Sequence, residues 1–152
     1  MGHNIESFQG KRVFVTGHTG FKGTWLTFLL KELGAEVLGY ALTPEPSSPS
    51  HFNLLGMQDK IHHVVGDVRD SSNLNATMQS FQPDIVFHLA AQALVKKSYE
   101  DPTITFDTNV MGSVNLLDAV RQCPTVRSLV YITSDKCYEN VEWVWGYREN
   151  DL

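Results

Sequence analysis

Residues 13–23 read VFVTGHTGFKG, an apolar run followed by a loop with glycine at every third position. An amphipathic segment comes next, so the predicted order is strand, glycine loop and helix. Glycine adopts a positive φ without a Cβ clash and leaves main-chain N–H groups bare. These groups and the positive end of the helix dipole attract phosphate. In this position the G-x-x-G-x-x-G spacing indicates a dinucleotide-binding loop.

The composition is that of an ordinary globular domain. The chain has 152 residues, of which 42% are hydrophobic and 19% charged, enough for one domain with a core. Its net charge of −5 argues against nucleic-acid and membrane-surface partners, because no basic patch stands out. Two cysteines are too few for a disulfide framework, and residues 1–9 lack the apolar core of a signal peptide. We therefore expect a cytoplasmic protein with reduced thiols.

Apolar strand patterns alternate with helical patterns along the chain. The strands are predicted over residues 12–16, 36–42, 61–65, 84–90 and 127–133. Such alternation implies an α/β fold, a Rossmann-type doubly wound parallel sheet with right-handed crossovers. The expected strand order is 3-2-1-4-5, with the ligand crevice between the carboxyl ends of the first and fourth strands.

The main helices are predicted over about residues 23–33, 71–81 and 104–122. Gly34 is expected to end the first helix, and Asp70 or Ser71 to cap the second. Residues 43–56, with three prolines among serines, read as a surface loop. The apolar stripes expected to face the sheet are Trp25, Leu26, Leu29, Leu30 and Leu33 in the first helix, and Val110, Val114, Leu117 and Val120 in the last.

Several of these segments resemble the extended short-chain dehydrogenase/reductases that act on nucleotide sugars. The matching segments are TGHTGFKG at 16–23, GDVRD at 66–70, HLAAQ at 88–92 and NVMG at 109–112. Within that family, TSDKCY at 133–138 and EWVWGYRE at 142–149 are similar to the CDP-glucose 4,6-dehydratases. The resemblance covers nearly the whole chain from Gly10 onward. It implies a lyase that takes a nucleotide sugar as substrate and holds NAD as a transient hydride acceptor.

The resemblance also implies which residues bind the cofactor. The glycine loop with Phe21 and Lys22 would line the pyrophosphate, and Asp67 would accept a hydrogen bond from the adenine amino group. The small residues after the fourth strand would pass beneath the ribose, and Asn109 would contact the cofactor from the long helix. The complete set is Gly17, His18, Gly20, Phe21, Lys22, Gly23, Asp67, Val68, Ala90, Ala91, Gln92, Asn109 and Thr133.

The catalytic residues implied by the resemblance follow the fifth strand. Ser134 would hydrogen-bond the sugar hydroxyl that is oxidised, and Asp135 would protonate the departing 6-hydroxyl. Lys136 would take the place of the base that removes the C5 proton, where the better-known dTDP-sugar dehydratases have glutamate. The family's Tyr-x-x-x-Lys pair does not occur in these 152 residues. We therefore expect residues 1–152 to be the NAD(P)-binding part of a longer enzyme, without full turnover alone.

Some alternatives remain open from the sequence. The second strand does not end in an acidic residue that would bind the ribose 2′-hydroxyl of NAD, and no arginine near it would bind the 2′-phosphate of NADP. NAD is therefore favoured over NADP only by the family resemblance. His88 is expected to be a core histidine bonded to backbone, and the His62-His63 pair, pointing to opposite faces, no metal site. Trp143 and Trp145 either cover the crevice or simply pack. Other possible functions are a related epimerase or reductase and a catalytically inert NAD(P)-binding module. A homo-oligomer through the long helix is plausible.

Overall fold

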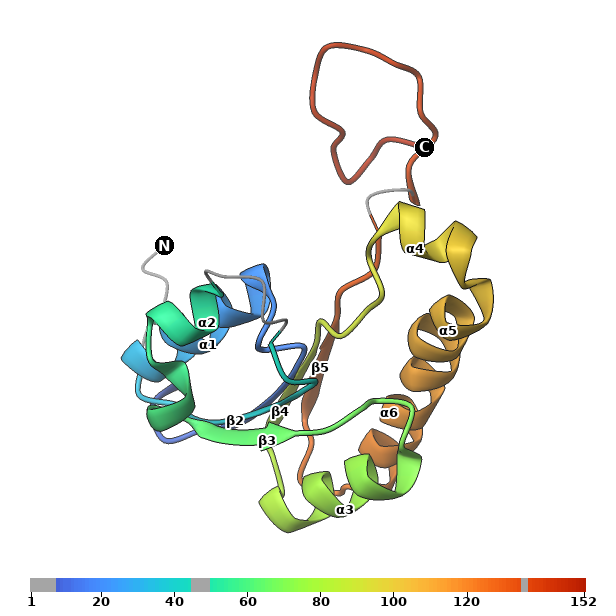
Figure 1. The fold of residues 1–152 in the computed structure, drawn as a ribbon. Helices are drawn as coiled ribbons and strands as arrows, with labels where there is room; N and C mark the ends of the chain where they lie inside the picture. Colours follow the sequence, from blue (N-terminus) through green and yellow to red (C-terminus); the bar gives the residue numbers. More distant parts are fainter. Residues whose placement is uncertain (1–7, 45–49, 135–136) are drawn as a thin grey trace.

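A parallel five-stranded sheet forms the centre of the computed structural model, which describes residues 8–44, 50–134 and 137–152 (Figure 1). The strands are β1 (Arg12–Thr16), β2 (Glu36–Ala41), β3 (His62–Val65), β4 (Ile85–His88) and β5 (Ser128–Tyr131). Their order is β3-β2-β1-β4-β5, which confirms the predicted topology. β4 is shorter than predicted because its ladder with β1 ends at the pair Thr16 and His88. β5 ends opposite the same histidine.

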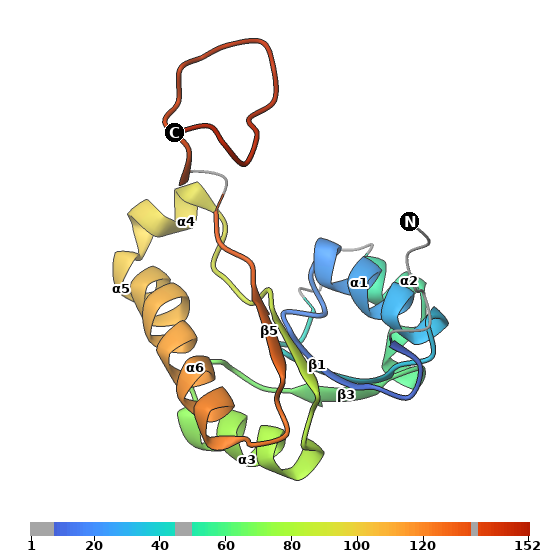
Figure 2. The ribbon, with the colours of Figure 1, turned by 180° about the vertical axis from the view of Figure 1, so that it is seen from behind.

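Helices cover both faces of the sheet (Figures 1 and 2). α1 (Phe21–Glu32) and α2 (His51–Leu54) lie on one face, and α3 (Ser71–Phe81), α5 (Pro102–Phe106) and α6 (Gly112–Gln122) on the other. α4 (Val95–Glu100) lies beyond the carboxyl end of β4, a 3-10 turn η2 (Met57–Asp59) precedes β3, and a π-helical segment η3 (Asp107–Met111) joins α5 to α6. The predicted long helix is therefore present with a π segment inside it.

The core has two layers, one on each face of the sheet. β1 contributes to both, since Val13 and Val15 point toward α1 while Phe14 points toward α3 and α6. Alternate residues of a strand face opposite sides, so a strand covered on both sides is apolar throughout. The two layers confirm the doubly wound architecture.

The inward face of α1 differs from the predicted one. Leu30 is buried and Leu26 packs against the core, as predicted, but Trp25 and Leu29 are exposed. The other buried residues of the helix are Gly23, Thr24 and Thr27. The helix lies so close to the preceding loop that a Cβ on Gly23 would clash with the carbonyl oxygen of Gly17. Small side chains therefore face the sheet, and the tryptophan turns outward against His51 of α2.

The same correction applies to the last helix. Val120 packs against the core as predicted, but Val110, Val114 and Leu117 are exposed. The buried residues of α6 are Gly112, Ser113, Leu116 and Ala119, against the sheet and α3. A Cβ on Gly112 would lie 2.7 Å from Cγ2 of Val68, so the contact again requires a small residue. Apolar spacing alone did not identify the buried stripe, because close packing selected the stripe of smaller residues.

The helix ends agree with the sequence, but the predicted loop does not. Asp70 caps α3 by accepting a hydrogen bond from N–H of Asn73, and Gly34 follows α1 with a φ of +80°. Within the predicted loop 43–56, residues 51–54 form α2, and residues 45–49 lie outside the described residues. α2 forms because Phe52 is buried against the rings of His18 and His63.

Candidate cofactor-binding site

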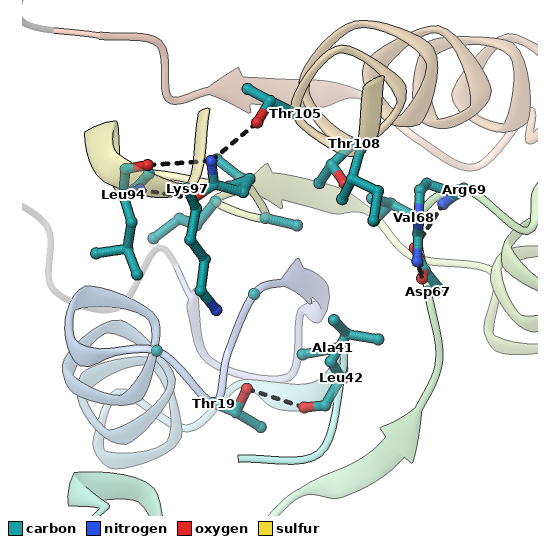
Figure 3. A pocket seen from close by; sticks show the side chains of 18 of the residues that line it. Thr19, Ala41, Leu42, Asp67, Val68, Arg69, Leu94, Lys97, Thr105 and Thr108 are labelled. Atoms are coloured by element: carbon teal, nitrogen blue, oxygen red, sulfur yellow. Dashed lines mark hydrogen bonds and ion pairs between the residues drawn. The ribbon is translucent and has the colours of Figure 1, made fainter. Parts of the chain in front are cut away.

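A cavity of about 760 Å³ lies at the carboxyl ends of the strands (Figure 3). One wall is the glycine loop after β1 with the end of β2, and the floor is the segment after β4. The opposite wall comes from α4 and α5, and the segment after β3 closes one end. This is the switch point at which open α/β sheets bind ligands, as the strand order predicts.

The glycine loop offers bare main chain to the cavity. Gly17 has a φ of +71°, and a Cβ there would lie 2.7 Å from the nitrogen of Ala90. Gly17 and Gly20 line the cavity, and Gly20 N–H donates to the Gly17 carbonyl at 3.1 Å. Because no side chain is tolerated at Gly17 and Gly23, the loop fits a diphosphate that binds to N–H groups at the start of α1.

Asp67 and Arg69 form an ion pair at the end of the cavity nearest β3 (Figure 3). Arg69 Nη2 donates to Asp67 Oδ2 at 2.6 Å, and Arg69 N–H donates to Asp67 Oδ1 at 2.9 Å. These hydrogen bonds hold the pKa of the Asp67 carboxyl below its usual value. Val68 lines the cavity beside them. The carboxylate is therefore ionised and held in a fixed position at this end of the cavity.

Buried Tyr40 supports this end of the cavity from below. Its hydroxyl donates to the Asp67 carbonyl at 3.1 Å, and a Cβ on Gly66 would clash with its ring. Burial, with smaller effects of Asp70 and Asp67, raises the pKa of Tyr40 to about 12. The phenol is thus a fixed neutral donor.

Ala90, Ala91 and Gln92 line the floor of the cavity, whereas Asn109 does not belong to the described lining. Asn109 accepts a hydrogen bond from Gln92 N–H at 2.7 Å and donates to its carbonyl at 3.0 Å. Both ends of its side-chain amide are therefore bonded to the main chain after β4, and Asn109 is absent from the described lining of the cavity. Its observed role is to hold the floor in place.

His88 lies beneath the floor in a chain of hydrogen-bonded side chains. Its Nδ1 is 2.7 Å from the Thr16 hydroxyl oxygen, and its Nε2 is 3.3 Å from that of Ser113. Ser113 is in turn 2.7 Å from the Tyr131 hydroxyl. The prediction of a core histidine is correct, but its partners are side chains instead of backbone. Burial lowers the pKa of His88 to about 4.

His18 is buried under the glycine loop, away from the cavity. Its Nε2 is 2.7 Å from Nδ1 of His63, its ring packs edge-on against Phe52, and Gly39 gives it room because a Cβ there would clash. Burial and the neighbouring His63 lower the pKa of His18 to about 4. The side chain therefore cannot reach a cofactor in the cavity, and only its main chain remains for such a contact.

The remaining predicted residues lie around the cavity or beyond the description. Phe21 stacks on His51 and is exposed, and neither Phe21, Lys22 nor Thr133 belongs to the described lining. Ser134 is exposed after β5. Asp135 and Lys136, two of the three proposed catalytic residues, lie outside the described residues.

The structure also adds lining residues that the sequence analysis missed. Thr19 donates from its hydroxyl to the Leu42 carbonyl at 3.1 Å, which joins the glycine loop to the end of β2. Lys97 and Thr105 line the opposite wall. The motif GDVRD could have indicated the role of Arg69, since an arginine two residues after the aspartate can pair with it. No comparable motif in α4 indicated that Lys97 would line the cavity.

Metal and membrane sites find no support in the described part of the chain. No group of three or more His, Cys, Asp or Glu side chains is arranged to hold a metal ion among the described residues. His62 pairs with Glu36 while His63 faces His18, so the two histidines point to opposite faces, as predicted. Within the described ranges, none of the helices has the length and apolarity to span a bilayer. Trp143 and Trp145 are exposed and are not among the described lining residues.

Sequence comparison identifies the family. Residues 14–150 match the model of the GDP-mannose 4,6 dehydratase family. The chain belongs to this family. It is also 56% identical over 144 residues to CDP-glucose 4,6-dehydratase of Salmonella typhimurium, a match that covers 95% of this chain and 40% of that protein. The chain thus spans less than half the length of this dehydratase.

Solved structures extend the family relationship to the fold. The epimerase Mth375 of Methanothermobacter thermautotrophicus aligns with a TM-score of 0.79 and 28% identity, over 97% of this chain and 42% of that one. UDP-glucose 4-epimerase of Brucella ovis, solved in complex with NAD, aligns with a TM-score of 0.66 and 32% identity, over 80% of this chain and 35% of that one. The chain therefore shares its fold with a part of each of these epimerases.

Proposed function

We propose that this chain is the cofactor-binding part of a CDP-glucose 4,6-dehydratase that uses NAD. The proposal is carried by the 56% identity to the Salmonella enzyme over 95% of the chain. The bare glycine loop and the fixed carboxylate of Asp67 support it, because they offer partners for a diphosphate and for adenine. Asp67, Val68 and the segment 90–92 are proposed to bind the adenosine half, and Gly17 and Gly20 the diphosphate.

The proposed reaction removes water between C5 and C6 of the sugar. NAD, held by the glycine loop and the segment 90–92, would supply reversible hydride-acceptor chemistry for C4 and C6, with no net oxidation of the sugar. The ketone at C4 acidifies the C5 proton. We assign the removal of this proton to Lys136. Asp135 would donate the proton with which the 6-hydroxyl leaves as water, and Ser134 would hydrogen-bond the C4 oxygen. These three roles follow from the family resemblance.

The direct test is incubation of the complete protein with CDP-glucose and NAD. We expect CDP-4-keto-6-deoxyglucose as the product, identified by mass and by its keto absorbance in alkali. Formation of the C4 epimer would instead assign the chain to an epimerase. NAD binding without any turnover of CDP-glucose would favour a cofactor-binding module.

We expect NAD to bind more tightly than NADP, though by less than about tenfold. The cavity edge at the end of β2 consists of Ala41 and Leu42, and residues 36–44 contain no cation. A 2′-phosphate would lose water against Leu42, and Arg69, the cation that lines this end of the cavity, is already bonded to Asp67. A 2′-hydroxyl would lack the usual carboxylate at the end of the second strand. Dissociation constants for both cofactors, measured by calorimetry, check this, and a clear preference for NADP would refute it.

We also propose that two copies associate through the outward stripe of the long helix. Phe106, Val110, Val114 and Leu117 are exposed on one side of it at helical spacing, and such contiguous apolar surface commonly marks an interface. We expect Val114→Glu to shift the protein from dimer to monomer in sedimentation experiments. The matched control is Val144→Glu, at an exposed valine in the 137–152 loop. This substitution should leave the sedimenting mass of the dimer unchanged. A monomeric wild type would contradict the proposal.

A further inference from the structure

The two walls of the cavity carry different chemistry. The wall after β1 presents the glycine loop, whose N–H groups start α1. The opposite wall is α4, from which the Lys97 side chain extends into the cavity toward the side of Thr19 and the glycine loop (Figure 3). A diphosphate seated on the loop would therefore have N–H groups on one side and an ammonium group on the other.

The short helix α4 is held in position by the floor of the cavity. Gln92 accepts a hydrogen bond from Leu94 N–H at 2.7 Å, and its side-chain amide donates to Thr105 at 3.0 Å. Asn109 fixes the main chain of Gln92 in turn. The contacts thus run from the long helix through the segment after β4 to Leu94, the residue that precedes α4, and they hold the start of the helix that carries Lys97.

The cations near the cavity differ in where they lie. Two cationic side chains occur among the described lining residues, Arg69 and Lys97. Arg69 is bonded to Asp67 through its guanidinium and lies at the β3 end. Lys22, which the sequence suggests for the pyrophosphate, is exposed on α1 and does not belong to the described lining. By position, Lys97 is the cation that faces the glycine loop.

We propose that Lys97 binds the diphosphate of the dinucleotide from the wall opposite the glycine loop. This inference rests on the proposed use of NAD. A lysine ammonium acts as a compact point charge with three donors, which suits a diphosphate whose other oxygens are held by main-chain N–H groups. Lys97 then joins the two walls when the dinucleotide binds.

The test compares Lys97→Gln with Lys96→Gln in the complete protein. Lys96 is the matched control, because it lies on the same helix, is 89% exposed and pairs with Glu100 at 3.7 Å. We expect Lys97→Gln to weaken NAD and ADP-ribose by roughly fivefold to tenfold, the typical loss for a partly solvated charge-assisted bond. Lys96→Gln should change both by less than about twofold. Lys97→Arg should restore most of the affinity.

Two further measurements separate a diphosphate contact from other roles. Adenosine, which lacks phosphate, should bind equally well to the wild type and Lys97→Gln. The salt dependence of NAD binding should be shallower in Lys97→Gln, since one ionic contact is lost. Equal losses for adenosine and NAD would indicate a general distortion of the cavity and would overturn the proposal.

The outcomes also distinguish this inference from the proposed function. If the wild type binds NAD and the two glutamine variants behave alike, Lys97 has no such role and the proposed function stands. If Lys97→Gln weakens CDP-glucose but not NAD, the lysine serves the diphosphate of the substrate and the inference is wrong. A wild type that binds neither NAD nor ADP-ribose would overturn both.

Discussion

Gly17→Ala is expected to weaken NAD binding at least about a hundredfold and to lower the free energy of unfolding by about 3 kcal/mol. Two effects add at this position. The φ of +71° is unfavourable for any residue with a Cβ, and that Cβ would lie 2.7 to 2.9 Å from three main-chain atoms of Leu89 and Ala90. These atoms belong to the backbone of the cavity floor, so they cannot turn aside as a flexible side chain would. Calorimetry with NAD and urea unfolding measure the two losses.

Gly10→Ala is the matched control for this substitution. Gly10 has almost the same conformation, with a φ of +69°, but a Cβ there would meet nothing within 4 Å. We expect Gly10→Ala to lower the free energy of unfolding by about 1 kcal/mol, because only the unfavourable positive φ contributes. The affinity for NAD should be unchanged. Equal effects of the two substitutions would mean that the approach of the loop to Ala90 is not what the site requires.

The fold could be predicted because its local and overall signals agree. β1 is apolar throughout because helices cover it on both faces, and the glycines after it occur where a helix and a strand approach closely. Alternating strand and helix patterns then leave few topologies, since parallel crossovers are right-handed. The strand order and the edge of the sheet that carries the cavity follow from these features.

The buried face of each helix could not be predicted in the same way. α6 has two stripes of small or apolar residues, and hydrophobic spacing favoured the stripe with Val114 and Leu117 over the one with Leu116 and Ala119. Which stripe is buried depends on how closely the helix approaches the sheet, and Gly112 against Val68 sets that distance. Such a contact joins residues far apart in the sequence.

The direction of individual side chains was equally hidden from the sequence. His18 lies inside the glycine motif, yet its ring turns under the sheet edge because Gly39 on the neighbouring strand leaves space for it. Asn109 is bonded to main chain, although the resemblance implies a cofactor contact, while Lys97, which the sequence analysis did not single out, reaches the cavity. Family resemblance identifies such positions, but only the packed structure says where they point.

Two buried histidines make the stability of the fold depend on pH between about 6.5 and 4. Burial lowers the pKa of both His18 and His88 to about 4, and His63 beside His18 acts in the same direction. In the unfolded chain a histidine takes up its proton near pH 6.5. Above that pH neither state is protonated and the full stability is present. As the pH falls, the unfolded state gains protons that the folded state excludes, and stability is lost.

We therefore expect the free energy of unfolding to fall by up to about 1.4 kcal/mol per pH unit for each of the two histidines in this range. Asp67 and Asp118, whose carboxyl pKa values are lowered by their arginine partners, lose their contributions to stability only at more acidic pH, so the pH range of the histidine effect is separate.

Urea unfolding of His88→Gln at several pH values measures this effect. The free energy of unfolding of the variant should fall less steeply with pH than that of the wild type, by the contribution of one proton, whatever its stability at pH 7.5. His62→Gln, at an exposed histidine, controls for loss of a surface imidazole. If His88→Gln does not fold, NMR titration of the wild type gives the same answer, because the imidazoles of His18 and His88 should stay neutral at pH 5. Titration of all imidazoles near pH 6.5 would contradict the expectation.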